Sequence, residues 1–242
     1  MKAIQIDNLT KRYRDVLAVD GLTLCIEEGE LFSLLGVNGA GKTTTIKMLS
    51  GLTQPTSGEA YLHGKSIVKE PSAVKSLIAV SPQETAVAPG LSVYENLELM
   101  CGVFGFAKDK RSEKIKELTA LFGLDSVLRE KAAQLSGGWQ RRLSIAMALI
   151  SEPKILFLDE PTLGLDVIAR SDLWDMIRAL KGKVTVVLTT HYMEEAEALS
   201  DRIAIMNDGR LLLCDTPAAI MQQTGEGSIE KAFIKIVRGE EK

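Results

Sequence analysis

The sequence has little histidine and cysteine, and these shortages exclude several kinds of site. Its two histidines, His63 and His191, cannot build a metal centre from several imidazoles. Its three cysteines, Cys25, Cys101 and Cys214, lie far apart and are odd in number, so they offer neither a disulfide framework nor the CxxC spacing of a zinc site. We therefore interpret the cysteines as packing residues.

Long uncharged stretches are also missing. The longest stretches without Asp, Glu, Lys or Arg are eleven residues, at positions 31–41 and 48–58, whereas about 20 apolar residues are needed to cross a bilayer. The first residues do not combine a charged start with an apolar block and a small-residue cleavage site. We therefore expect a cytosolic chain that does not itself span a membrane.

Charge of one sign does not dominate the composition. The 29 Lys and Arg residues face 32 Asp and Glu residues, which gives a net charge of −3. This balance lacks the basic surface of a nucleic-acid-binding protein, so no nucleic-acid partner is expected. With 242 residues, of which 45% are hydrophobic, the chain is long enough for one large domain or two small lobes around a real core.

Hydrophobic periodicity predicts a mixed α/β chain. Strands are predicted at residues 3–9, 22–26, 31–35, 155–158, 184–190 and 203–206. Helices are predicted near residues 43–52, 167–180 and 193–199, with a turn at 54–58. Between residues 93 and 151 the spacing is helical throughout. Near-continuous apolar strands separated by helices imply a parallel sheet covered on both faces, here interrupted by a helical insertion.

A glycine-rich segment connects a predicted strand to a predicted helix. Residues 36–43, GVNGAGKT, fit the phosphate-loop pattern GxxxxGK[ST] in the context that this pattern requires. Glycines let successive backbone N–H groups curl around an anion, and the following helix N-terminus adds partial positive charge. Lys42 can then reach the β- and γ-phosphates while the Thr43 hydroxyl ligates Mg²⁺. A chance glycine turn before a helix is the alternative.

A second feature is an apolar strand that ends in two carboxylates, Asp159 and Glu160. Ligands bind at the carboxyl ends of strands in open parallel sheets. Asp159 would hold Mg²⁺ through water, and Glu160 would face the attacking water as general base or polariser. An acidic pair that only caps the next helix remains the alternative.

The third feature is a second candidate phosphate cradle. Ser136, Gly137 and Gly138 precede a helix whose apolar face includes Trp139 and Leu143, and Ser plus two Gly at a helix start can bind an anion. Two cradles in one chain suggest either two nucleotides or one nucleotide shared between two chains. An ordinary structural N-cap would also explain this segment.

These three motifs, in this order, resemble the ATP-binding-cassette family of nucleotide-binding domains, and the resemblance extends over the whole chain. It implies an α/β P-loop NTPase fold with a RecA-like core holding a parallel-rich sheet, an antiparallel β lobe near the N-terminus and an inserted α-helical subdomain. It also implies one nucleotide-binding domain over residues 1–242. Within it, residues 1–83 and 152–215 would form the catalytic core, residues 84–151 the helical signature subdomain and residues 216–242 a short C-terminal tail.

The resemblance assigns roles to single residues. Tyr13 would stack on adenine, Gln83 would contact Mg²⁺ and the attacking water, and His191 would touch the γ-phosphate. Edge packing of Tyr13, a solvated loop position for Gln83 and helix capping by His191 are the alternatives. The implied catalytic residues are Glu160, His191, Gln83 and Lys42, and the implied metal ligands are Thr43, Gln83 and Asp159. The implied ATP-binding residues are Tyr13, Gly36, Val37, Asn38, Gly39, Ala40, Gly41, Lys42, Thr43, Thr44, Ser136, Gly137, Gly138 and Asp166 of the 164–166 interface loop. Trp139 departs from the glutamine that the family often has there, and its helical spacing favours packing.

The resemblance further implies an ATPase that pairs head to tail with a second cassette, most simply as a homodimer, and so powers transport. A separate membrane permease would be contacted through the region from Gln83 to Glu95, which places the chain at the cytoplasmic face of the cell membrane. Residues 191–197, 201–205 and 228–233 resemble ATPase subunits of ABC-2 type exporters. The alternatives are the ATPase of an importer, a non-transport cassette and a phosphate-loop small-molecule kinase.

Overall fold

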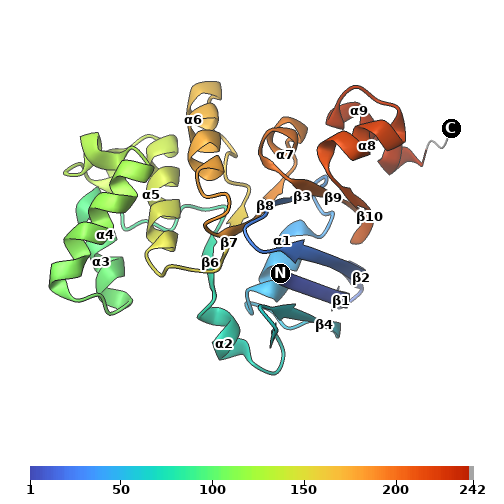
Figure 1. Cartoon of the computed structure of the whole chain (residues 1–242), viewed down its shortest axis with the longest axis horizontal. Helices are drawn as coiled ribbons and strands as arrows, with labels where there is room; N and C mark the ends of the chain where they lie inside the picture. Colours follow the sequence, from blue (N-terminus) through green and yellow to red (C-terminus); the bar gives the residue numbers. More distant parts are fainter. Residues whose placement is uncertain (240–242) are drawn as a thin grey trace.

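The larger of two sheets is built from the apolar runs. In the computed structural model, which describes residues 1–239, this sheet has the order β10-β9-β3-β8-β7-β6. Its strands are β3 (Leu31–Leu35), β6 (Ile78–Ser81), β7 (Ile155–Asp159), β8 (Thr185–Thr190), β9 (Arg202–Asn207) and β10 (Arg210–Asp215). All neighbours pair in parallel except β9 and β10. The predicted parallel-rich sheet is therefore confirmed (Figure 1).

The smaller sheet is antiparallel and has the order β2-β1-β4-β5. Its strands are β1 (Lys2–Tyr13), β2 (Val16–Glu27), β4 (Ser57–Leu62) and β5 (Lys65–Ser66). Helix α1 (Lys42–Leu49) buries Ile46, Met48 and Leu49 in one cluster with side chains of both sheets, such as Ile4 and Phe157. The expected antiparallel lobe near the N-terminus is therefore present, and its packing fixes the start of α1.

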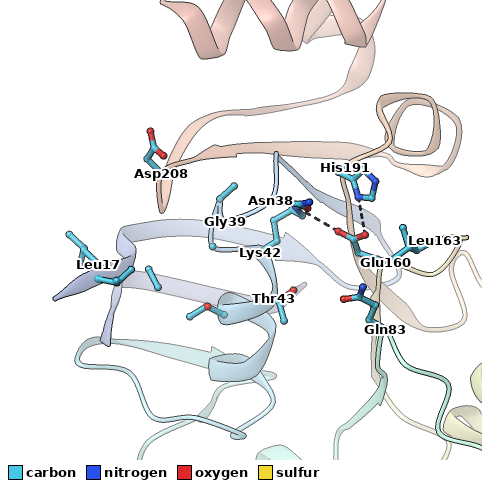
Figure 2. Close-up of a pocket in the computed structure, with 15 residues that line it drawn as sticks. Leu17, Asn38, Gly39, Lys42, Thr43, Gln83, Glu160, Leu163, His191 and Asp208 are labelled. Carbon is cyan, nitrogen blue, oxygen red and sulfur yellow. Dashed lines mark ion pairs between the residues drawn. The ribbon is translucent and has the colours of Figure 1, made fainter. Parts of the chain in front are cut away.

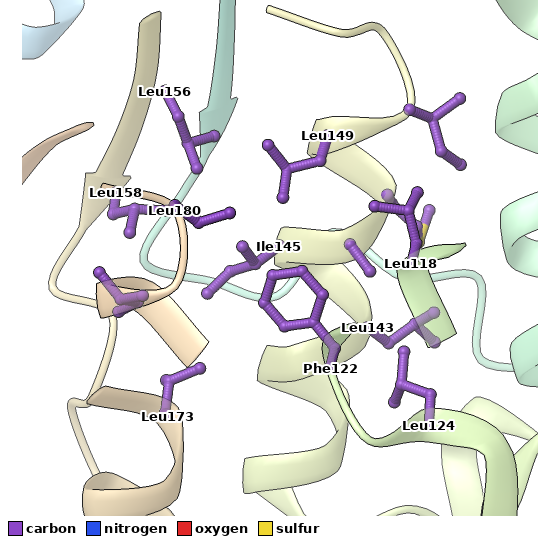
Figure 3. Close-up of a cluster of buried hydrophobic side chains, with 14 of the residues drawn as sticks. Leu118, Phe122, Leu124, Leu143, Ile145, Leu149, Leu156, Leu158, Leu173 and Leu180 are labelled. Atoms are coloured by element: carbon purple, nitrogen blue, oxygen red, sulfur yellow. The ribbon is translucent and has the colours of Figure 1, made fainter. Parts of the chain in front are cut away.

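The chain between β6 and β7 is helical and lies to one side of the large sheet (Figure 1). It contains α3 (Val93–Val103), α4 (Lys108–Leu121), the 3₁₀ turns η1 (Leu124–Val127) and η2 (Ala132–Gln134), and α5 (Gly137–Leu149). Figure 3 shows Phe122 among Leu118, Leu143 and Ile145 in the core that these helices share with the sheet and with α6 (Val167–Arg178). The predicted helical insertion is confirmed.

The residues of β7 show why a continuous apolar strand is needed. Ile155 and Phe157 pack in the cluster around α1, whereas Leu156 and Leu158 pack against the helical side. Successive side chains of a strand point to opposite faces, so a sheet covered on both faces requires apolar residues at every position. The carboxyl end of β7 therefore emerges from a dry core with its carboxylate, Asp159, in a fixed place.

The C-terminal part of the chain packs on the far end of the sheet. Helices α8 (Pro217–Thr224) and α9 (Ile229–Arg238) pack beside β9 and β10, and α7 (Met193–Leu199) lies between them and α6, over β3 and β8 (Figure 1). Helix α9 buries Ile229, Ala232 and Phe233 against β9 residues such as Ile203. The predicted tail thus packs on the core, and its residues 240–242 lie outside the described part of the chain. Within residues 1–239, no helix is both long and apolar enough to cross a bilayer.

Several element bounds differ from the sequence prediction. Strands β4, β5, β6 and β10 and helices α2 (Pro71–Lys75), α8 and α9 were not predicted, and β4 begins inside the predicted 54–58 turn. Strand β6 has only four residues, and β10 is an edge strand whose side chains are at least partly exposed, so neither shows a clear buried pattern. Helix α1 ends at Leu49, three residues earlier than predicted, because Gly51 takes a left-handed conformation with φ of 69°.

Candidate active site

The carboxyl ends of β3, β7 and β8 open on one cavity of about 790 Å³, a size suited to a small-molecule ligand. Figure 2 shows the phosphate loop on one side of it and Gln83, Glu160 and His191 on another. The cavity is lined by Val16, Leu17, Ala18, Asn38, Gly39, Ala40, Gly41, Lys42, Thr43, Thr44, Gln83, Glu160, Leu163, His191 and Asp208.

The phosphate loop between β3 and α1 depends on glycine for its shape. Gly41 has φ of 97°, and a Cβ atom placed on it would lie 2.5 Å from the carbonyl oxygen of Ala18. Only glycine combines that backbone with such a close approach to β2. At the first position of α1, the Lys42 ammonium donates to the carbonyls of Gly36 at 2.7 Å and Val37 at 3.1 Å. The loop therefore folds around Lys42, whose ammonium group is directed at backbone carbonyls of the loop.

The environment of Lys42 shifts its proton affinity in two directions. Burial lowers the pKa of Lys42 from its ordinary value, while the carboxylates of Glu160 and Asp159 act to raise it. The Nζ atom lies 3.9 Å from Oε1 of Glu160, and the lysine side chain is 5% exposed. A buried cation of this kind is stabilised by any further negative charge brought into the loop.

Asp159 and Glu160, at the end of β7, face different partners. The Asp159 carboxylate accepts hydrogen bonds from the hydroxyls of Thr43, at 3.1 Å, and Thr189. The Glu160 N–H donates to the carbonyl oxygen of Thr189 at 3.1 Å, and Glu160 has φ of 47°. Left-handed backbone is uncommon for a residue other than glycine and often accompanies functional sites. The chain thus turns sharply between two adjacent carboxylates and separates them.

The Glu160 carboxylate lies between two basic groups. Its Oε2 atom is 2.8 Å from Nδ1 of His191, and its Oε1 atom faces Lys42 (Figure 2). Only 11% of the Glu160 side chain is exposed. Gln83 follows β6 and lies on the same side of the cavity (Figure 2). A carboxylate held near a phosphate loop in this way is placed to act on a water molecule at the end of a bound phosphate chain.

Not all residues implied by the sequence lie at this cavity. Tyr13, Ser136, Gly137, Gly138 and Asp166 are absent from its lining. The ring of Tyr13 is 42% exposed at the end of β1, and the Lys11 ammonium lies 4.9 Å from its centroid. Gly36 and Val37 contribute through their carbonyls to Lys42, and Asp159 through its bond to Thr43.

The second cradle lies at the start of α5, close to the start of α6. Ser136 is the N-cap of α5, and its side chain accepts no capping hydrogen bond from that helix. Asp166 caps α6 by accepting from the N–H of Ala169 at 2.9 Å. A Cβ atom on Gly138 would lie 3.1 Å from that of Ala169. The two helix starts therefore contact each other, away from the cavity.

Trp139 has a packing role in this chain. Its ring packs against the helical core, and the guanidinium of Arg142 lies 4.6 Å from the ring centroid. Its indole is therefore held within the helical part of the chain.

Sequence reasoning missed several residues that shape the site. Val16, Leu17 and Ala18 form a wall of the cavity, but β2 was predicted to begin only at residue 22. Asp208 lines the same side of the cavity from the turn between β9 and β10 (Figure 2), where an Asp-Gly pair is a recognisable turn signal. The sequence alone did not place these residues at the site, because their position depends on how the strands pair.

A buried carboxyl beside the site was also missed. Glu195 on α7 is 0% exposed, and its Oε1 atom accepts from the hydroxyl of Thr162 at 2.8 Å and from the indole N–H of Trp174 at 3.2 Å. Burial raises the pKa of Glu195 from its ordinary value. Because Thr162 follows Glu160 by two residues, Glu195 ties α7 to the segment that carries the catalytic candidate.

Sequence comparison places the chain among known transport ATPases. The family model described as "ABC transporter" matches residues 19–163. Nod factor export ATP-binding protein I of Burkholderia lata is 40% identical over 90% of this chain and 72% of its own length. The daunorubicin/doxorubicin resistance ATP-binding protein DrrA of Streptomyces peucetius is 40% identical over 93% of this chain and 68% of its own. The phospholipid-transporting ATPase ABCA3 of Homo sapiens is 41% identical over 93% of this chain, which spans only 13% of that much longer protein.

Solved structures share the fold. The ATP-binding subunit of an ABC transporter superimposes with a TM-score of 0.85 at 28% identity, covering 97% of this chain and 99% of that one. A dimeric ATP-binding cassette in a post-hydrolysis state with ADP and Pi gives a TM-score of 0.78 at 28% identity, covering 88% of this chain and 98% of that one.

Proposed function

The chain belongs to the ABC transporter family of ATP-binding domains, and on that premise we propose that it is the ATP-hydrolysing subunit of an ABC-2 type exporter. The observation that carries the proposal is the placement of the Glu160 carboxylate, 2.8 Å from His191 and 3.9 Å from Lys42, at the mouth of a phosphate loop. The two bacterial relatives named for drug resistance and Nod factor export support the exporter assignment.

The loop residues would bind the phosphates of ATP. Lys42 would exchange its bonds to the Gly36 and Val37 carbonyls for bonds to the β- and γ-phosphates, and the N–H groups of the loop would face the same oxygens. Glu160 would take a proton from the attacking water. His191 would contact both the Glu160 carboxylate and the γ-phosphate, and so fix their relative positions. The cavity wall formed by Val16, Leu17 and Ala18 would cover the adenine base of ATP.

The residues proposed to hold Mg²⁺ fit that ion. The Thr43 hydroxyl and the Asp159 carboxylate lie 3.1 Å apart, and Gln83 adds an amide oxygen at the same cavity. Such hard oxygen ligands, with a single carboxylate among them, match the preference of Mg²⁺ for one or two carboxylates completed by phosphate and water. When bound, Mg²⁺ would neutralise charge that develops on the β- and γ-phosphates.

We propose a homodimer in which each ATP lies between two chains. Ser136, Gly137, Gly138 and Asp166 lie outside the cavity, at exposed starts of α5 and α6. A second copy placed head to tail would bring its Ser136 hydroxyl and glycine N–H groups to the γ-phosphate. Tyr13, at the exposed end of β1, remains our candidate for stacking on the adenine.

A separate permease is the proposed membrane partner, contacted through the region from Gln83 to Glu95 and the adjoining part of α3. A groove of about 670 Å³ is lined there by Leu91, Glu95, Glu98, Leu99, Gly102, Val103 and Arg111. Leu99 is 50% and Val103 68% exposed, and contiguous exposed apolar residues mark protein interfaces. This contact would hold residues 1–242, as one nucleotide-binding domain, at the cytoplasmic face of the membrane. Within the domain, residues 84–151 would form the contacting subdomain, beside a core of residues 1–83 and 152–215 and a tail of residues 216–242.

The test is affinity purification of the tagged chain from detergent-solubilised native membranes, followed by mass spectrometry. A multi-spanning permease of the ABC-2 class, recovered in stoichiometric amount, is the expected result. A permease accompanied by a solute-binding protein would overturn the exporter assignment, and recovery of no membrane protein would overturn the transport function. ATP hydrolysis by the purified chain is measured in parallel.

A further inference from the structure

Arg141 joins three segments of the candidate site through their backbone. It lies on α5 and is buried, at 3% exposure. Its Nε atom donates to the carbonyl of Pro161 at 2.9 Å, and one terminal nitrogen donates to the carbonyl of Asp159 at 2.8 Å. The other terminal nitrogen donates to the carbonyl of Pro82 and, at 3.5 Å, to that of Gln83.

All of these acceptors are neutral carbonyls. The guanidinium of arginine keeps its charge at neutral pH. A buried cation is expensive unless its donors are satisfied, and the rigid planar fork of arginine fixes the direction of each bond. The acceptors therefore have little freedom to move relative to α5.

The fixed carbonyls lie on both sides of the catalytic candidate. Asp159 and Pro161 are the neighbours of Glu160 in the chain, and Pro82 and Gln83 form the start of the loop that follows β6. Arg142, the next residue of α5, differs in that it pairs with Asp172 and stacks on Trp139. Of these two arginines, Arg141 is thus the one that connects α5 to the backbone on either side of Glu160 and at Gln83.

We propose that Arg141 is a positioning residue for ATP hydrolysis, which sets the backbone of Glu160 and Gln83 relative to α5. The inference rests on the proposed function, because it assumes that Glu160 and Gln83 act on the attacking water. Helix α5 begins at Gly137, next to Ser136, so a phosphate seated on this helix start in a head-to-tail dimer is linked through about one turn of helix to the chain's own hydrolytic site. Arg141 would therefore affect the rate of hydrolysis more than the affinity for ATP.

The first test compares Arg141→Met with a matched control, Arg202→Met. Arg202 also makes several hydrogen bonds, to Glu30 and to the carbonyl of Cys25, but joins β9 to β2 and the segment before β3, away from the cavity. Arg141→Met is expected to lower kcat about 10- to 100-fold while the KM for ATP changes less than about threefold, the split expected when a group acts mainly in the transition state. Arg202→Met is expected to lower the melting temperature and to leave kcat within about twofold of the wild type. Equal kcat in wild type and Arg141→Met would overturn the proposal, and so would a parallel loss of kcat in both variants.

Arg141→Lys keeps the charge but not the fork, and it serves if the Met variant does not fold. It is expected to retain an intermediate kcat, and to show faster amide hydrogen exchange in the peptides that contain Gln83 and Glu160 than the wild type does. Unchanged exchange in both peptides would overturn the positioning role. If the wild type itself does not hydrolyse ATP, the proposed function fails, whereas the exchange measurement still reports whether Arg141 fixes these segments.

Discussion

At the scale of single residues, the site depends on one glutamate whose position is fixed by its backbone. Glu160 follows the last residue of β7, takes a left-handed conformation and donates its N–H to Thr189. This backbone conformation places the Glu160 carboxylate so that it faces Lys42 and His191.

Replacing this carboxylate should separate hydrolysis from binding. We expect Glu160→Gln to lower kcat for ATP hydrolysis by about 10²- to 10⁴-fold, the usual contribution of a general base. The affinity for ATP should change little, because the amide keeps the shape of the side chain and Lys42 loses only a competing carboxylate. Steady-state hydrolysis and equilibrium nucleotide binding measure the two effects. A variant with wild-type kcat would rule out a catalytic role for Glu160.

Glu195 predicts a pH dependence of stability. Its pKa is raised in the folded chain by burial, so its contribution to stability is complete below the unfolded-state pKa and is lost as the pH rises towards the folded-state value. Glu195→Gln retains an acceptor for Thr162 and Trp174 and cannot titrate. The melting temperature of this variant relative to that of the wild type should therefore rise as the pH increases from the ordinary glutamate pKa of 4.5 towards the folded-state value.

The control for this pH series is Glu194→Gln, which changes the exposed neighbour on the same helix. Its melting temperature should follow that of the wild type across the range. A constant difference between Glu195→Gln and the wild type at every pH would contradict the prediction.

At the residue scale, the sequence predicts candidate site residues where a motif has a fixed spacing. It gives no signal for residues outside such motifs. Lys42 and Thr43 carry a recognisable loop pattern, and the structure brings them to one cavity with Glu160. Arg141 carries no such pattern, because its partners are backbone carbonyls, which every residue possesses. Glu195 looks like an ordinary helix-forming glutamate until tertiary packing buries it.

At the scale of elements, strands buried on both faces were predicted from the sequence, whereas short strands and edge strands were not. Strands with residues buried on both faces, such as β3 and β8, stood out as continuous apolar runs. Strands β6 and β10 did not, because one is too short and the other pairs on a single side with a partly exposed pattern. Pairing with a neighbouring strand, rather than local propensity, creates such strands. The Val16–Ala18 wall of the cavity was missed for the same reason, because this end of β2 is held by its hairpin with β1, where Val16 pairs with Tyr13.

The helical insertion should depend on one aromatic side chain. Phe122 ends α4 and is completely buried among Leu118, Leu143 and Ile145 (Figure 3). We expect Phe122→Ala to lower the free energy of unfolding by about 3–5 kcal/mol, because it removes a large apolar group and leaves a cavity. Calorimetry or chemical denaturation measures the loss.

The matched control is Phe104→Ala, at the end of α3, where the ring is 48% exposed. Truncation of an exposed ring should change stability by no more than about 0.5 kcal/mol. Equal losses for the two variants would show that the insertion does not rely on the packing around Phe122.

At the scale of the whole molecule, the two groups of residues proposed to bind ATP lie apart within one chain. The cavity holds the phosphate loop, Gln83, Glu160 and His191, whereas the Ser136 cradle lies at the start of α5 and does not line it. In the homodimer that we propose, a single chain leaves both halves incomplete, and a symmetric pair completes two sites at once. ATP would add negative charge between the halves, which favours the closed pair, and hydrolysis would remove this link.

This arrangement predicts an ATP-dependent dimer that is trapped when hydrolysis is blocked. Glu160→Gln with ATP and Mg²⁺ should elute as a dimer in size-exclusion chromatography with light scattering, and as a monomer with ADP. Adding Ser136→Glu should abolish the dimer, because a carboxylate on the cradle repels the γ-phosphate bound by the other chain. ATP binding by each chain should persist in the double variant, since Ser136 does not line the cavity. A double variant that still dimerises would place the second half-site elsewhere on the surface, and Glu160→Gln that stays monomeric at saturating ATP would contradict the shared site altogether.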